Sequence, residues 1–166
     1  MGTVNLLNSG WQTNKSLSSI DINTTSTYVE FILDGGNTQG YAKACIAIDA
    51  SKYSTISFNY SSVSRYGNTS LQFGVFDNMT PNDSTGTIIL SDGDFNNSSG
   101  GSVSKAISLS GTKYVGFRFY VNSSGVGYCK AKPYITSLTA TEKGYTLTYN
   151  ANGGSGKYVP RTAGEA

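Results

Sequence analysis

The sequence has no histidine, and this absence excludes several classes of enzyme at once. Neither a Ser-His-Asp triad nor a Cys-His pair can form without an imidazole that acts as the base. The sequence also lacks the G-x-S-x-G motif of hydrolases and the P-loop of nucleotide-binding enzymes. Its acidic residues stand almost wholly in turn-like segments, with only Glu30 in a convincing strand. We therefore expect a protein that is not an enzyme.

Charged residues are also scarce, at 13% of the chain against about 25% in a typical soluble protein. The net charge is +2, and Lys130 with Lys132 is the densest basic pair. A nucleic-acid-binding protein needs a larger basic surface to neutralise phosphates, so nucleic acid is not expected as a partner. No apolar run reaches the ~18 residues of a membrane-spanning helix, so we expect no membrane insertion.

The first residues lack the basic region and the apolar segment of a signal peptide. We therefore expect either a mature chain or a protein that leaves the cell without secretion, for example by lysis. The expected location is a virion, or the outside or surface of a cell.

Cysteine is rare, and both examples, Cys45 and Cys129, stand inside strand-like runs. Two interpretations remain open: both are small buried residues, or they form a disulfide between adjacent strands. A metal site at these cysteines is not expected, since no histidine could complete it.

The chain is rich in Ser, Thr, Asn, Gly and Tyr, and its apolar residues recur at every second position. This period of two is the signature of a strand with one buried face. It is clearest between residues 113 and 121, which we expect to form a central strand. There the apolar residues Val115, Phe117, Phe119 and Val121 alternate with Gly116, Arg118 and Tyr120.

Other strand-like runs are separated by turns rich in Gly, Asn and Ser, and no run has the spacing of a helix. We expect strands at 5–7, 27–33, 41–48, 55–61, 70–76, 87–90, 103–109 and 134–141, with 41–48 buried on both faces. Residues 12–26 are interpreted as a loop or a weak edge strand. The sequence therefore predicts an all-β fold, a jelly-roll-like antiparallel β-sandwich of about eight to ten strands.

Three phrases spread over residues 3–141 carry a family resemblance: LLNSGW, YSTISFNYSS and YVGFRFYV. In strand pattern and order they resemble galactose-binding-like and carbohydrate-binding-module jelly rolls. Such domains occur in bacterial surface proteins and in phage tail or fibre proteins. The resemblance implies a sandwich domain over residues 1–142.

The tail has a different character. The segment 145–156, YTLTYNANGGSG, resembles the opening of the Listeria–Bacteroides repeat, the B-repeat of internalin-like surface proteins. The family's proline-rich continuation is replaced here by Lys157-Tyr158-Val159-Pro160-Arg161. We therefore expect an incomplete module over residues 143–166, either a truncated boundary or a single strand that docks on the sandwich.

The period of two also predicts which side chains point outward. If the best strands share one sheet, their outward residues, Phe76 among them, form a polar and aromatic face suited to a sugar. The alternative is a solvated face with a Glu30–Arg118 ion pair of little energetic value. The predicted ligand-binding residues are Tyr28, Glu30, Asn59, Gln72, Arg118 and Tyr120, together with Trp11.

A rival binding site would use loop aromatics. Trp11, Tyr41 and Tyr66 stand near predicted turns and could gather at one end of the sandwich. The alternative for Trp11 is a place in the core.

A calcium ion is the one cofactor that the sequence offers. Asp92, Asp94 and Asn96 place oxygen ligands at alternate positions of a loop, as a hard cation requires. The bidentate Glu of an EF-hand is missing, because position 103 is Val. Asp- and Asn-rich loops also occur as plain turns, so a solvated loop is the alternative. The galactose-binding-like resemblance implies that a structural calcium ion is compatible with the fold.

These observations predict a non-catalytic carbohydrate or cell-surface binding module, part of a phage virion or a bacterial surface protein. Its expected partner is a cell-surface glycan. The alternative is a purely structural module of a virion or fibre that contacts only protein partners. An accessory domain of a secreted glycoside hydrolase would share the same fold.

Overall fold

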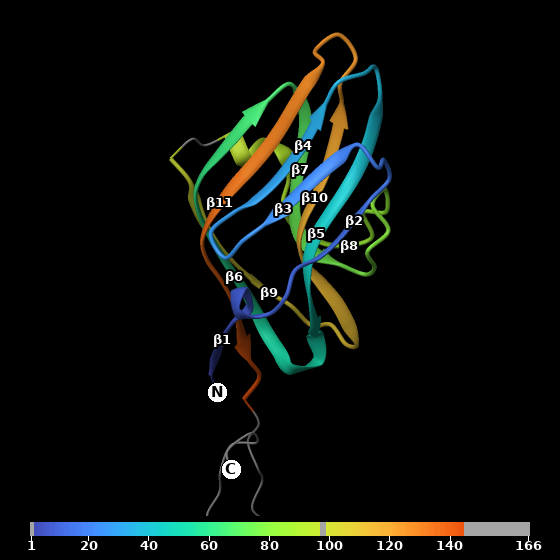
Figure 1. The fold of residues 1–166 in the computed structure, drawn as a ribbon. Coiled ribbons are helices and arrows are strands. Elements are labelled where there is room, and N and C mark those ends of the chain that lie inside the picture. Colours follow the sequence, from blue (N-terminus) through green and yellow to red (C-terminus); the bar gives the residue numbers. More distant parts are fainter. Residues whose placement is uncertain (1, 97–98, 145–166) are drawn as a thin grey trace, which may run out of the picture.

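The computed structural model describes residues 2–96 and 99–144, which form two stacked antiparallel sheets (Figure 1). Sheet A contains β1 (Thr3–Asn5), β3 (Ile20–Thr24), β4 (Val29–Asp34), β6 (Tyr53–Tyr66), β9 (Gly101–Ala106) and β11 (Tyr128–Glu142). Sheet B contains β2 (Gln12–Lys15), β5 (Gln39–Asp49), β7 (Asn68–Phe76), β8 (Gly86–Leu90) and β10 (Thr112–Asn122). Short 3₁₀ turns lie at η1 (Leu6–Asn8), η2 (Ala50–Lys52) and η3 (Asp92–Asn96). The predicted all-β sandwich is confirmed, with eleven strands in the described part.

Each sheet is built around one central strand, β11 in sheet A and β10 in sheet B. Sheet A has the order β3-β4-β11-β6-β9, with β1 beside the far end of β11, and sheet B has the order β2-β5-β10-β7-β8. The strand predicted to be central, β10, therefore lies between β5 and β7. Figure 1 shows that β10 and β11, consecutive in the chain, belong to different layers.

The core lies between the inner faces of the two sheets, and its aromatic rings join them. Phe31 of sheet A stacks on Phe119 of sheet B, with ring centroids 4.8 Å apart and planes 5° apart. Phe58 of sheet A lies 4.1 Å from Phe73 of sheet B. The apolar residues at alternate positions of these strands are fully buried, as the period of two predicts: Val29, Phe31, Phe58, Phe73, Val75, Phe117 and Phe119.

Some strand boundaries differ from the prediction. Residues 12–26 contain β2 and β3, each at the edge of its sheet, so the loop alternative is wrong and the edge-strand alternative is confirmed. All residues of β2 are exposed, so it carries no apolar signal, and it pairs with β5 at the edge of sheet B. β6 and β11 are longer than predicted. Register shifts near Tyr134 and Ile135 interrupt the alternation of buried and outward residues, but the hydrogen-bonded ladder between the two strands continues past them.

Strand β5 is buried on both faces, as predicted. Ala44 and Ile46 face the core, while Lys43 and Cys45 face outward and are still fully buried. The outer face of sheet B is covered at this point by residues 77–85, which we call the covering loop. Lys43 Nζ donates a hydrogen bond of 2.8 Å to the Asn78 carbonyl in this loop. Phe76, predicted to point outward, is buried there as well.

Both cysteines are free and buried, so the disulfide alternative is wrong. Cys45 lies in β5 of sheet B, whereas Cys129 lies in β11 of sheet A, and no ladder joins these strands. Burial raises the pKa of the Cys45 thiol to about 12. The interpretation of both cysteines as small buried residues is therefore confirmed.

The last described strand, β11, ends at Glu142. The predicted B-repeat-like segment 145–156 lies outside the described residues and stays a prediction. Within residues 2–96 and 99–144, no helix is long and apolar enough to cross a membrane.

Candidate functional site

The structure separates the predicted outward residues onto two opposite faces of the sandwich. Tyr28, Glu30 and Asn59 belong to the outer face of sheet A. Gln72, Arg118 and Tyr120 belong to the outer face of sheet B. The expectation that they share one sheet is wrong, because the strands that contain Glu30 and Asn59 flank β11 instead of β10.

Glu30 therefore does not pair with Arg118. Its carboxylate lies 3.7 Å from Lys132 Nζ, and it accepts a hydrogen bond of 3.0 Å from Asn23 Nδ2. Asn59 donates to Ser137 Oγ at 2.8 Å. The polar residues of this face are thus bonded across neighbouring strands.

The three loop aromatics do not form one site. Trp11 packs on the core, with its ring stacked 6.4 Å from Phe117 and its Nε1 donating to the Thr25 carbonyl at 3.2 Å. Tyr41 lies within β5 beside Tyr120, on the outer face of sheet B. Tyr66 is the last residue of β6 in sheet A. The rival site at one end of the sandwich is therefore wrong.

The residues of the predicted calcium loop lie in η3. Asp92 Oδ1 forms an ion pair with Arg65 and accepts a hydrogen bond of 2.8 Å from the Leu71 amide. Asp94 Oδ2 accepts from the Ser91 amide at 2.8 Å, and the side chain of Asn96 is not described. No group of three or more His, Cys, Asp or Glu residues in the described part is placed to hold a metal ion. The calcium site stays a prediction, and its carboxylates already have protein partners.

A row of tyrosines and lysines crosses the outer face of sheet A. Along the first half of β11 the outward positions carry two lysines between two tyrosines. The register places Tyr66 of β6 opposite Lys130, and Tyr28 opposite Tyr134. We call this set the tyrosine stripe; it contains Tyr28, Tyr66, Tyr128, Lys130, Lys132 and Tyr134.

One end of the tyrosine stripe is internally paired. The Tyr28 and Tyr134 ring centroids lie 6.0 Å apart. Lys132 Nζ lies 4.1 Å from the Tyr28 centroid and 5.1 Å from that of Tyr134. A hydrogen bond with Tyr134, and then the charge of Glu30, raise the pKa of Lys132. This ammonium therefore stays charged and holds both rings in place.

The other end of the tyrosine stripe is open. The Tyr66 and Tyr128 centroids lie 5.7 Å apart with their planes at 52°, and 58% of Tyr66 is exposed. Lys130 lies opposite Tyr66, and Asp34 lies opposite Tyr128. A pair of rings, of which Tyr66 is exposed and Tyr128 is partly buried, is thus flanked by a cation and a carboxylate.

The outer face of sheet B carries a different cluster around Arg118. Its guanidinium donates to Gln72 Oε1 at 3.1 Å and to the carbonyls of Pro81 and Asn82 at 2.9 and 3.1 Å. It lies 4.7 Å from the centroid of Tyr41, whose ring is 5.1 Å from that of Tyr120. We call this cluster the arginine site; it contains Gln39, Tyr41, Gln72, Arg118 and Tyr120.

The sequence prediction did not include Tyr128, Lys130, Lys132 or Tyr134. Their signal was present, since these residues alternate with Cys129, Ala131 and Pro133 on the buried face. Pro133 obscured it, because proline is rare in a central strand. In the structure, the ladder between β11 and β4 ends at Ala131, before this proline.

Comparison with known proteins does not assign this chain to a family. No family model matches it, that of the B-repeat included, and no curated protein matches either. Among solved structures, it is similar to CBM86, a low-affinity xylan-binding module from the gut symbiont Roseburia intestinalis. The identity is 9%, the TM-score is 0.42, and the match covers 81% of this chain and 96% of that chain. A similarity of this degree carries no argument about function.

Proposed function

We propose that the protein is a non-catalytic carbohydrate-binding module whose glycan lies on the tyrosine stripe of sheet A. The observation that carries this proposal is the open pair of Tyr66 and Tyr128. A sugar needs an aromatic surface for its apolar C–H face and polar groups for its hydroxyls. Lys130 and Asp34 lie beside the rings and offer a donor and an acceptor.

The rigidity of the stripe supports the same proposal. Its residues in β6 and β11 belong to neighbouring strands of sheet A, and Tyr28 is joined to Tyr134 by a bridge, so each ring is anchored by backbone pairing. Tyrosine has few rotatable bonds, so fixing it on a ligand costs little entropy. A glycan on such a surface would meet the protein at a cell surface or on a virion, which is the location that we propose.

A glycan array followed by calorimetry on the best ligand tests the proposal. We expect Tyr66→Ala and Tyr128→Ala each to weaken binding at least about tenfold, a loss of roughly 1.4 kcal/mol. Val126→Ser is the matched control, because Val126 is 45% exposed in the adjacent hairpin and is not part of the stripe. Absence of binding across the array, or wild-type affinity in both tyrosine variants, would contradict the proposal.

One observation favours a second candidate, a structural module that contacts only protein. Tyr66 and Val126 are the large apolar side chains most exposed in the described part of the chain. Exposed aromatics of this kind also mark protein interfaces. This candidate predicts symmetric oligomers in light scattering that Val126→Ser weakens, whereas the glycan-binding module predicts a monomer that this substitution leaves unchanged.

A further inference from the structure

Two neighbouring cations on the outer face of sheet B have no carboxylate partner. Arg118 of β10 and Lys43 of β5 are direct register partners. All hydrogen bonds of Arg118 go to neutral oxygens, and Lys43 donates to a backbone carbonyl. The ion pairs of the described residues involve Arg65, Lys113 and Lys132, but neither of these two cations.

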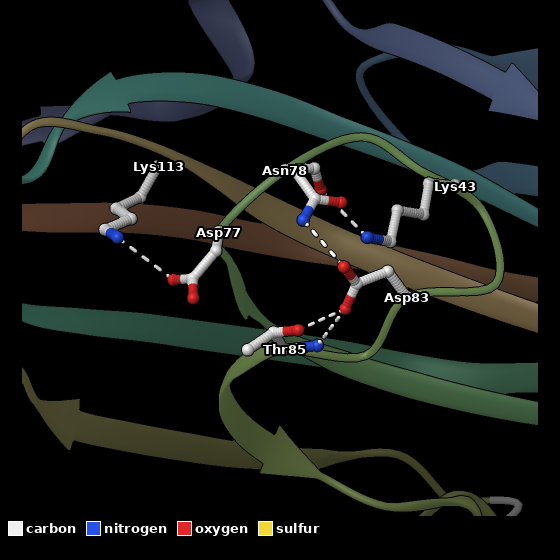
Figure 2. A network of polar contacts seen from close by, with 6 residues as sticks. All are labelled: Lys43, Asp77, Asn78, Asp83, Thr85 and Lys113. Carbon is white, nitrogen blue, oxygen red and sulfur yellow. Dashed lines mark hydrogen bonds and ion pairs between the residues drawn. The ribbon is translucent and has the colours of Figure 1, made fainter.

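The acids of the covering loop are bonded elsewhere, as Figure 2 shows. Asp77 pairs with Lys113 at 3.0 Å. Asp83 accepts from the Asn78 side chain at 2.9 Å, from the Thr85 amide at 2.8 Å and from the Thr85 hydroxyl. The Asp83 carboxylate therefore attracts Lys43 and Arg118 only across a longer distance.

Burial makes this arrangement costly. Desolvation is the largest cause that lowers the pKa of both Lys43 and Arg118, and the two charges also repel each other at Lys43. Lys43 is fully buried beneath the covering loop and beside the Phe76 ring, whose centroid lies 4.7 Å from Nζ. Lys43 therefore contributes only its charge, while the half-buried Arg118 is accessible to a ligand. An anion at Arg118 would be attracted by both charges in surroundings that screen them less than water does.

Arg118 has hydrogen-bonding capacity left for such an anion. A guanidinium carries five N–H groups; three of them donate to Gln72, Pro81 and Asn82, and Tyr41 also hydrogen-bonds this side chain. At least one N–H group therefore remains for a carboxylate oxygen, and such a charge-assisted hydrogen bond is stronger than one between neutral groups.

The rings beside Arg118 indicate what carries the carboxylate. Tyr120 lies two residues farther along the same face of β10, roughly 7 Å away. Its hydroxyl donates to Gln39 Oε1 at 3.1 Å, which fixes the ring. A sugar ring stacked on Tyr120 would therefore reach Arg118 with a substituent.

We propose that the arginine site binds a carboxylate-bearing sugar, such as a uronic acid within an acidic polysaccharide. Tyr120 stacks on the sugar ring, and Arg118 takes the carboxylate. This site is separate from the tyrosine stripe, because the two lie on opposite faces of the sandwich. The proposal shares with the proposed function only the chemical class of its ligand.

Calorimetry with three probes tests the ligand class. The probes are an oligogalacturonate, the same oligosaccharide with its carboxyl groups reduced to alcohols, and inorganic phosphate. We expect the acidic oligosaccharide to bind at least about tenfold more tightly than the reduced one, and its affinity to fall with added salt. Equal affinity for the acidic and reduced oligosaccharides would overturn the proposal, and so would phosphate binding as tight as that of the acidic sugar.

Two variants separate a binding role from a structural one. Arg118→Lys keeps the charge but loses the planar guanidinium and its fixed donors, and we expect at least about tenfold weaker binding of the acidic oligosaccharide. Because Arg118 also holds the covering loop, Tyr120→Ala provides an independent test that leaves those loop contacts in place. We expect a similar loss there, with an unchanged melting temperature. Wild-type binding of the acidic sugar by Tyr120→Ala would overturn the proposal.

Tyr66→Ala distinguishes this proposal from the proposed function. It disables the tyrosine stripe on the opposite face, so we expect acidic-sugar binding to persist at wild-type affinity. Loss of that binding in Tyr66→Ala would place the acidic sugar on sheet A and overturn the arginine site. Failure of the tyrosine stripe to bind any neutral glycan would leave the acidic-sugar measurements unaffected.

Discussion

At Gly116 the backbones of β10 and β5 approach each other closely. This residue lies in the middle of β10, between Cys45 of β5 and Gly74 of β7. A Cβ atom at this position would lie 2.2 Å from the Ala44 carbonyl oxygen and 2.7 Å from the Cys45 Cα. Both atoms belong to the backbone and cannot move aside cheaply, so only glycine fits here.

We therefore predict that Gly116→Ala lowers the free energy of unfolding by at least about 2 kcal/mol. Urea denaturation monitored by the fluorescence of Trp11, the single tryptophan, measures this change. Gly10→Ala is the control, since nothing lies within 4 Å of a Cβ at Gly10. Equal losses in the two variants would show that the close approach of β10 to β5 has no energetic role.

Single residues also show the limits of the sequence prediction. The alternation around Arg118 correctly places its side chain on an outer face, since Phe117 and Phe119 are buried. It does not reveal that Pro81 and Asn82 supply acceptors for this side chain. These contacts join residues far apart in the chain, and no local pattern encodes them.

At the scale of elements, the covering loop depends on Asp83. Hydrogen bonds from Thr85, and then from Asn78, lower the pKa of Asp83 from 3.8 to about 2. Because the folded pKa is depressed, the ionised carboxylate stabilises the loop above pH 3.8. This stabilisation is lost as the pH falls toward 2.

We predict that protonation of the Asp83 carboxylate in acid weakens the hydrogen bonds that hold the covering loop. Hydrogen exchange of the amides in residues 77–85, normalised to the unfolded peptide, should show weaker protection near pH 2 than near pH 5. Asp83→Asn cannot ionise, so its loop should be less protected than the wild type near pH 5 and equal to it near pH 2. The same acid-induced loss of protection in both proteins would assign it to another group.

The positions of most strands could be predicted from the sequence, but the strands that lie beside them in each sheet could not. Each strand with a clear period of two buries the predicted face, because one face of every central strand packs on the core. The pattern carries no information about which strand lies beside which, so it could not separate Glu30 from Arg118. Register shifts near Ile135 also hide the continuity of β11, since an inserted residue exchanges the two faces.

At the scale of the whole molecule, Phe58 couples the two layers. It belongs to sheet A and contacts two rings of sheet B, Phe73 at 4.1 Å and Phe117 at 5.6 Å between centroids. Phe117 in turn packs on Trp11, which therefore reports on the same core. Removing the Phe58 ring would leave a cavity between the sheets.

We predict that Phe58→Ala lowers the free energy of unfolding by about 3–5 kcal/mol while both sheets still unfold in one transition. Trp11 fluorescence reports on sheet B, and hydrogen exchange of β6 and β11 reports on sheet A. Two separate transitions would show that the sheets are not coupled through this ring cluster.

The pairing of β1 with β11 has a consequence for how the chain folds during synthesis. Thr3 pairs with Thr141, and Figure 1 shows β1 lying beside the end of β11. The first strand thus has no partner until the last one has left the ribosome, so sheet A closes only after nearly the whole domain has been translated. Bringing the two ends of so long a segment together costs conformational entropy, which slows the formation of this ladder. Until it forms, the unpaired strands of the nascent chain are exposed and prone to aggregation.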